Sequence, residues 1–235
     1  VLRRNTSDGD IISFRKDGST VGSIGSRSGV AAYIVLDPRA SGCGLTGVGT
    51  VIRPTNESGT TNDASVALGS SINRFKDLYL SGGVYLGGTG SANHLDDYEE
   101  GNWTPQFGGS STTGTGTYST TVGRYVKVGK KVNCWGVIVS NGTHSGTGNL
   151  QITGLPFNKE NTYLSWGTET SIGYYWGLTS FGTATNVLRL LGPVSNGNYL
   201  RFHSFQNTGD TSLAPSPVHI QNGTSVYFSA TYEVQ

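Results

Sequence analysis

Four aromatic residues in the second half of the chain have the side chains best suited to binding a ligand. They are Trp166, Tyr174, Tyr175 and Trp176, and several glycines flank them. Sugars present weakly polar C–H faces that stack on aromatic rings, and their hydroxyls need hydrogen-bonding partners. The residue types therefore predict a carbohydrate-binding surface. The alternative is that the same rings fill a core or a subunit interface.

A second group of side chains could supply the polar part of such a site. In residues 199–205, Leu200 and Phe202 alternate with a tyrosine, an arginine and a histidine, which predicts a strand with its polar residues on the non-core face. An arginine can bind an acidic sugar group through two parallel hydrogen bonds, and nearby amide or carboxylate groups can bind hydroxyls. The complete predicted glycan-binding set is Trp166, Tyr174, Tyr175, Trp176, Asn198, Tyr199, Arg201, His203 and Asp210.

The densest cluster of charge, in residues 92–105, could in principle do other chemistry. Its histidine and four acids are residue types that bind metal ions, but their spacing matches no zinc or calcium motif. A solvated turn explains the same composition, so we predict no metal site and no cofactor. The residues concerned are His94, Asp96, Asp97, Glu99 and Glu100.

Cleavage of a polysaccharide would require a pair of carboxylates on either side of the bond. Three acids of the second half are scattered among predicted loops, namely Glu160, Glu169 and Asp210. The sequence also contains no GxSxG motif and no convincing Ser/His/Asp constellation. We therefore predict no catalytic residue and no enzymatic activity. A glycan-degrading or deacetylating enzyme remains the alternative.

Composition limits the architecture that can position these groups. The chain has 235 residues, 36 of them glycine, and only 34% are hydrophobic, so a single large core is not expected. A formal net charge of +1 disfavours nucleic acid as a partner, and no apolar run is long enough to insert into a membrane. Methionine is absent, from which we expect the chain to be the C-terminal piece of a longer protein or a processed product.

The pattern of strands predicts an all-β protein with three parts. Residues 1–91 contain short strands with few apolar side chains, including a hairpin around Asp17 and Gly18, and such strands need partner chains to be stable. Residues 106–235 contain longer strands, among them the doubly apolar 132–140 and the alternating 226–234, which predict an antiparallel, jelly-roll-like β-sandwich head. Residues 92–105 then form a junction or collar between shaft and head.

Three segments resemble the C-terminal halves of bacteriophage tail fibres and tailspikes. They are residues 5–25 (NTSDGDIISFRKDGSTVGSIG), 68–90 (LGSSINRFKDLYLSGGVYLGGTG) and 95–105 (LDDYEEGNWTP), with looser similarity at VGRYVKV (122–128) and ITGLPF (152–157). The resemblance implies an elongated, β-rich homotrimer in the virion tail, synthesised in the bacterial cytoplasm, whose tip touches the host surface. It implies no named catalytic residue.

From the residues and the resemblance together, we expect a receptor-binding protein that attaches the virion to a host surface glycan, lipopolysaccharide or capsule, without cleaving it. The rest of the tail would join through an N-terminal part outside this sequence. Two alternatives stay open, namely the glycan-degrading or deacetylating tailspike and a purely structural spacer of the fibre.

Overall fold

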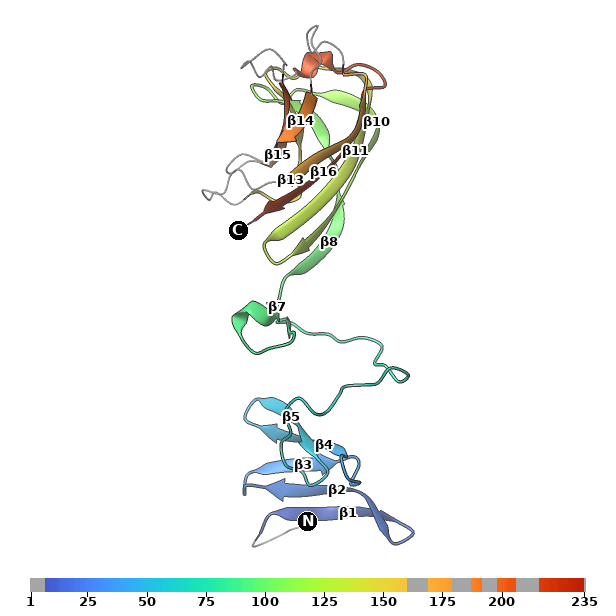
Figure 1. The fold of residues 1–235 in the computed structure, drawn as a ribbon, viewed down its shortest axis with the longest axis vertical. Helices are drawn as coiled ribbons and strands as arrows, with labels where there is room; N and C mark the ends of the chain where they lie inside the picture. The colour runs from blue at the N-terminus through green and yellow to red at the C-terminus, as the bar shows by residue number, and fades with distance from the viewer. Residues whose placement is uncertain (1–6, 160–168, 179–186, 192–197, 206–215, 235) are drawn as a thin grey trace. The chain divides into compact units, whose positions relative to one another are not determined.

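The computed structural model describes residues 7–159, 169–178, 187–191, 198–205 and 216–234. All strand pairs among these residues are antiparallel, and the helical residues are confined to two single turns of 3-10 helix, Ser91–Asn93 and Pro217–His219 (Figure 1). The predicted all-β class is confirmed. The chain divides into two compact units, Val1–Tyr79 and Leu80–Gln235. In the part that the structure describes, no helix is long and apolar enough to cross a membrane.

The first unit is a five-stranded meander in which each strand pairs with the next along the chain (Figure 1). Asp17 and Gly18, both at positive φ, form the two-residue turn of the first hairpin, as predicted. The strands are β1 (Gly9–Lys16), β2 (Ser19–Arg27), β3 (Ala31–Val35), β4 (Cys43–Val48) and β5 (Val51–Asn56).

One face of this sheet is partly covered by the unit's own chain. Tyr33 is buried there, and its hydroxyl hydrogen-bonds with the carboxylate of Asp10 at 2.8 Å. The ring fits because Gly25 and Gly59 have no side chain, since a Cβ at either position would lie less than 3 Å from it. The segment after β5 therefore folds back over this face.

The opposite face carries an apolar residue from every strand. Inter-strand pairing places these side chains directly opposite one another, which makes a continuous line that we call the apolar row. The two central members, Ile34 and Leu45, are each 44% exposed. The row consists of Ile12, Ile24, Ile34, Leu45 and Pro54.

Between β5 and the next strand, residues 57–83 contain neither helix nor strand. The next strand is β6 (Val84–Tyr85), which pairs with β7 (His94–Leu95). The large apolar side chains of this segment are left in water by a single chain. Leu68, Ile72, Phe75, Leu78, Tyr79 and Leu80 are each more than half exposed.

The second unit contains two antiparallel sheets that share one core, which confirms the predicted sandwich. The five-stranded sheet has the order β13 (Glu169–Trp176), β16 (Ser225–Glu233), β11 (Lys131–His144), β10 (Gly116–Val128) and β8 (Tyr98–Trp103). The four-stranded sheet has the order β14 (Val187–Leu191), β15 (Tyr199–Phe205), β12 (Leu150–Thr153) and β9 (Gln106–Gly109).

Alternation along the strands builds this core, as expected for sheets with one buried face. In β16, Val226, Phe228, Ala230 and Tyr232 are buried while the residues between them are exposed or half-buried. Trp103 at the end of β8 is also buried, with its ring edge-on to Phe228 at 5.9 Å. Strand β8, which lies within the predicted junction of residues 92–105, therefore belongs to the five-stranded sheet of the sandwich. The predicted boundaries of shaft, junction and head stay predictions.

His144, at the end of β11, makes the stability of this unit depend on pH. The residue is buried, its Nδ1 accepts a hydrogen bond from the amide of Gly146 at 3.0 Å, and burial lowers its pKa below the usual 6.5. As pH falls below about 6.5, the unfolded chain takes up this proton before the folded chain does, so the free energy of unfolding should decrease. Denaturant titrations between pH 7.5 and 5.5 should show a steeper loss in the native protein than in a His144→Asn variant. Equal slopes would contradict this assignment.

Candidate functional site

The structure places the predicted glycan-binding residues on two different sheets. Tyr174, Tyr175 and Trp176 lie on β13, whereas Tyr199 and Arg201 lie on β15, where Leu200 and Phe202 point into the core. The outer faces of the two sheets of a sandwich point in opposite directions, so these two groups do not share one surface. His203 belongs to β15 and Asn198 is an exposed residue just before it. Trp166 and Asp210 lie outside the described residues.

On β15, the side chains of Tyr199 and Arg201 contact each other. The guanidinium of Arg201 donates to the hydroxyl of Tyr199 at 3.1 Å and lies 5.5 Å from the centre of its ring. Both side chains are half-buried. This pair is therefore less available for a ligand than its sequence pattern suggests.

A β-bulge in β13 directs its aromatic residues outward. Ile172 is opposite the buried Phe228, but the register then shifts by one residue, so that Tyr174 is opposite Tyr227 and Trp176 is opposite Ser225. Tyr174 and Tyr227 meet edge to face at 5.8 Å. The bulge thereby places two side chains of the predicted set on the outer face of the five-stranded sheet.

Four exposed aromatic side chains form one line across this outer face, which we call the aromatic diagonal. Trp135 on β11 pairs with Ser229, two residues from Tyr227 on β16, which in turn pairs with Tyr174 on β13. The diagonal consists of Trp135, Tyr227, Tyr174 and Trp176, which are 44%, 48%, 52% and 67% exposed. From strand spacing and rise per residue, its length is about 16 Å. That length accommodates several consecutive sugar rings.

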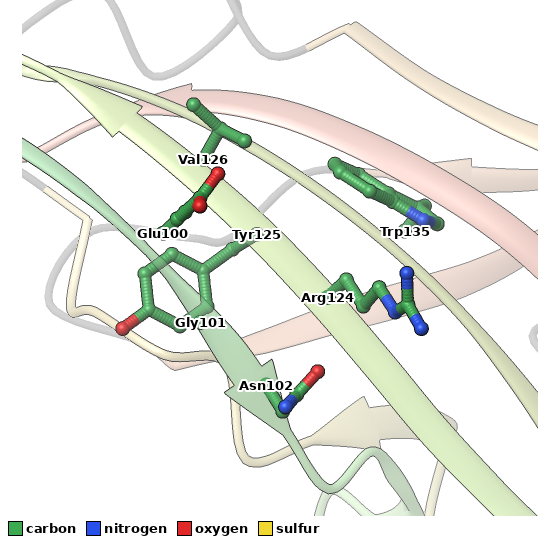
Figure 2. Close-up of a pocket in the computed structure, with 7 residues that line it drawn as sticks. All are labelled: Glu100, Gly101, Asn102, Arg124, Tyr125, Val126 and Trp135. Atoms are coloured by element: carbon green, nitrogen blue, oxygen red, sulfur yellow. The ribbon is translucent and has the colours of Figure 1, made fainter.

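Polar side chains continue the line from the Trp135 end of the aromatic diagonal. Asn102 on β8, Arg124 on β10 and Trp135 are directly opposite one another on successive strands, and Figure 2 shows the three side chains in one line. They border an open hollow of about 410 Å³, which is also lined by Glu100. Among the described residues, the guanidinium of Arg124 has no ion-pair partner. The hollow therefore offers free donors beside a stacking surface.

The carboxylates at this edge are held by tyrosine hydroxyls. Tyr98 donates to Glu100 at 3.0 Å, and Tyr125 donates to Glu99. Each hydrogen bond to a carboxylate raises the pKa of the tyrosine, so both phenols remain donors at neutral pH. Glu100 is thus fixed as an acceptor at the rim of the hollow.

The acids of the charged cluster each have a separate role. Asp97 pairs with the buried Lys127, and Asp96 lies 3.5 Å from Nδ1 of His94, whose ring stacks on Tyr85 at 4.4 Å. Nowhere in the described ranges do three or more histidine, cysteine or acidic side chains come close enough to hold a metal ion. Of the acids considered for catalysis, Glu160 and Asp210 lie outside the described residues, and Glu169 begins β13.

Sequence reasoning missed Trp135, Tyr227, Arg124, Asn102 and Glu100 as members of one surface. Trp135 lies in a run that is apolar on both faces, which concealed its outward orientation. The alternation of side chains along the last strand did predict that Tyr227 points away from the core. No signal in a single sequence pairs these residues across four strands.

Comparison with known proteins finds little. No family model matches the chain, and no curated protein matches its sequence. One solved structure with partial similarity is described as the crystal structure of Dettilon tailspike protein (gp208), with 16% sequence identity and a TM-score of 0.45. The alignment covers 58% of this chain, which spans about a quarter of the other protein (23%). A similarity this low assigns the chain to no family.

Proposed function

We propose that this chain is the distal part of a phage tail fibre or tailspike, and that its sandwich binds a host surface glycan, lipopolysaccharide or capsule, without cleaving it. The observation that carries the proposal is the aromatic diagonal, a line of exposed rings on the outer face of a rigid sheet. Exposed aromatic side chains that lie together mark interaction surfaces rather than chance exposure. Rings with polar groups at one end suit the alternating apolar and hydroxyl surfaces of a polysaccharide.

Binding without cleavage is supported by the charges beside the diagonal. The hollow is lined by one carboxylate, Glu100, and by the cation of Arg124. Hydrolysis of a glycosidic bond usually requires two carboxylates at a defined separation. A guanidinium and a carboxylate that face solvent together are suited to hydrogen-bonding neighbouring hydroxyls.

The homotrimer is supported by surface that one chain cannot bury. Subunits of obligate oligomers bury apolar surface against one another. The apolar row and the strandless segment of residues 57–83 supply apolar side chains for such contacts. Several identical heads would then raise weak glycan affinity by avidity.

A binding and product assay tests this function. The purified chain, incubated with a panel of bacterial lipopolysaccharides and capsular polysaccharides, should bind at least one saturably and release neither reducing ends nor acetate. A released product would identify the glycan-degrading or deacetylating alternative. Failure to bind any member, together with failure to compete with phage adsorption, would identify a structural spacer.

A further inference from the structure

The end of the first sheet holds a hollow that the glycan-binding proposal does not use. It has a volume of about 430 Å³ and lies where the β2–β3 and β4–β5 turns come together, with Thr61 completing its wall. Cavities of this size are in the range that binds small molecules. Its lining contains two arginines, Arg27 and Arg53, and no acidic residue.

Strand register places both arginines on the same face of the sheet. Arg27 is opposite Ala31 on β3, which shares its face with Tyr33, and Tyr33 is opposite Thr46, which is opposite Arg53. The two backbones are three strand spacings apart, about 14 Å. An arginine side chain can span about half of that distance. The small side chain of Ala31 and the glycines Gly47 and Gly49 leave the space between them open.

The hydrogen-bonding capacity of Arg27 is largely unused. Its Nε is buried and has no hydrogen-bond partner, while Nη1 reaches the hydroxyl of Thr61 only at 3.5 Å. An unsatisfied buried donor is costly, and it commonly indicates a bound water or ion. Among the described residues, Arg53 is exposed and has no ion-pair partner.

A third arginine of the same unit shows the contrasting arrangement. Arg39 makes hydrogen bonds of 2.9 and 2.6 Å to the two oxygens of Asp37, and this pairing lowers the pKa of the carboxyl to about 2. A carboxylate of the chain thus satisfies the planar guanidinium fork of Arg39. At Arg27 and Arg53 no carboxylate of the described residues does so.

We propose that this hollow binds an oxyanion, held between the guanidinium groups of Arg27 and Arg53 with Thr61 as a further donor. Phosphate, sulfate and carboxylate all match the arginine fork. The ligand is either a free anion or an anionic group carried on a polysaccharide, and the hollow has room for the sugar that would carry it.

Titration calorimetry with inorganic phosphate, at constant ionic strength in chloride, tests the site on the full chain. Native protein and an Arg15→Gln variant, which removes an exposed arginine of β1 outside the hollow, should bind phosphate equally. Arg27→Gln and Arg53→Gln should each bind at least about tenfold more weakly, because each loses a charge-assisted hydrogen bond. Phosphate should raise the unfolding temperature more in native protein and the Arg15 variant than in the Arg27 and Arg53 variants. The same measurement reveals any variant that fails to fold.

Dextran sulfate, with unmodified dextran as the uncharged control, distinguishes the two sources of the anion. Tighter binding of dextran sulfate than of phosphate, lost in the Arg27 and Arg53 variants, would assign the site to an anionic polysaccharide. Phosphate binding without a gain from the polymer would assign it to a free anion. The proposal is overturned if native protein binds neither phosphate nor dextran sulfate, or if the two variants bind as native protein does. The aromatic diagonal is intact in the Arg27 and Arg53 variants. Their binding of a neutral glycan should therefore equal that of the native protein, whichever anion the hollow binds.

Discussion

Replacing Trp135 or Trp176 with alanine should weaken glycan binding about thirtyfold each, without unfolding the protein. Truncation of a tryptophan that is a hot spot of an interface typically costs about 2 kcal/mol, which corresponds to that factor. Both side chains lie on the outer face of the sheet and are at least 44% exposed, so the stability of the fold should change by less than about 0.5 kcal/mol. Binding is measured on immobilised polysaccharide and stability by denaturant titration.

Two further substitutions make this result interpretable. Tyr85→Ala removes an aromatic ring that is 55% exposed on β6, a strand of a different sheet, and it should leave affinity unchanged. Tyr199→Ala removes the predicted aromatic of the opposite sheet. If only Tyr199→Ala reduces binding, the glycan site lies on the four-stranded sheet and the aromatic diagonal is not the receptor surface.

Introducing a carboxylate into the apolar row should dissociate the oligomer. Native protein should have about three times the 24.8 kDa chain mass in light scattering, and Ile34→Asp should approach the mass of one chain. The expected effect is large because every subunit would bury an unpaired charge in an apolar contact, at several kcal/mol each. Ile34 is 44% exposed in the single chain, so its replacement leaves the chain's own buried residues unchanged.

Val21→Asp is the matched control for this experiment. Val21 lies at the β-bulge where β2 pairs with β1, outside the paired positions of the apolar row, and is 49% exposed, so it tests the same added charge in a different place. The control should keep the native mass. A native mass near 24.8 kDa would exclude the trimer, and dissociation by Val21→Asp alone would assign the contact to the surface around Val21.

The sequence predicted the strands whose alternation matches a half-buried sheet. The final strand and the central strand after Lys131 were recognised, because apolar side chains there follow the period of the pleat and fill the core. Strands β4 and β5 could not be predicted in this way, since glycines and Pro54 interrupt a weak apolar pattern. They form because their neighbours in the meander supply hydrogen-bonding partners, which is a tertiary effect.

The candidate site was predicted only in part, for a similar reason. Chemistry identified Tyr174 and Trp176, but the bulge in β13 that sets their direction depends on pairing with β16. Tyr199 and Arg201 were grouped with them because of their residue types, and the topology separates the two groups. Trp135 and Arg124 join the surface through register alone. Residue type thus predicts the kind of ligand, whereas strand order decides which side chains can meet it.

The bulge at Ile172 and Tyr174 also bears on how a receptor-binding protein of the proposed kind could change its host. Beyond the bulge, outward positions carry the exposed rings that we propose to bind glycan, while the inward positions of β16 and β11 carry the core. Outward side chains can therefore be exchanged with little cost to folding, and the spacing between them is fixed by the backbone. Adaptation to a new surface polymer would proceed by substitution at regularly spaced positions. The repeat distance of an acceptable polymer would stay nearly constant.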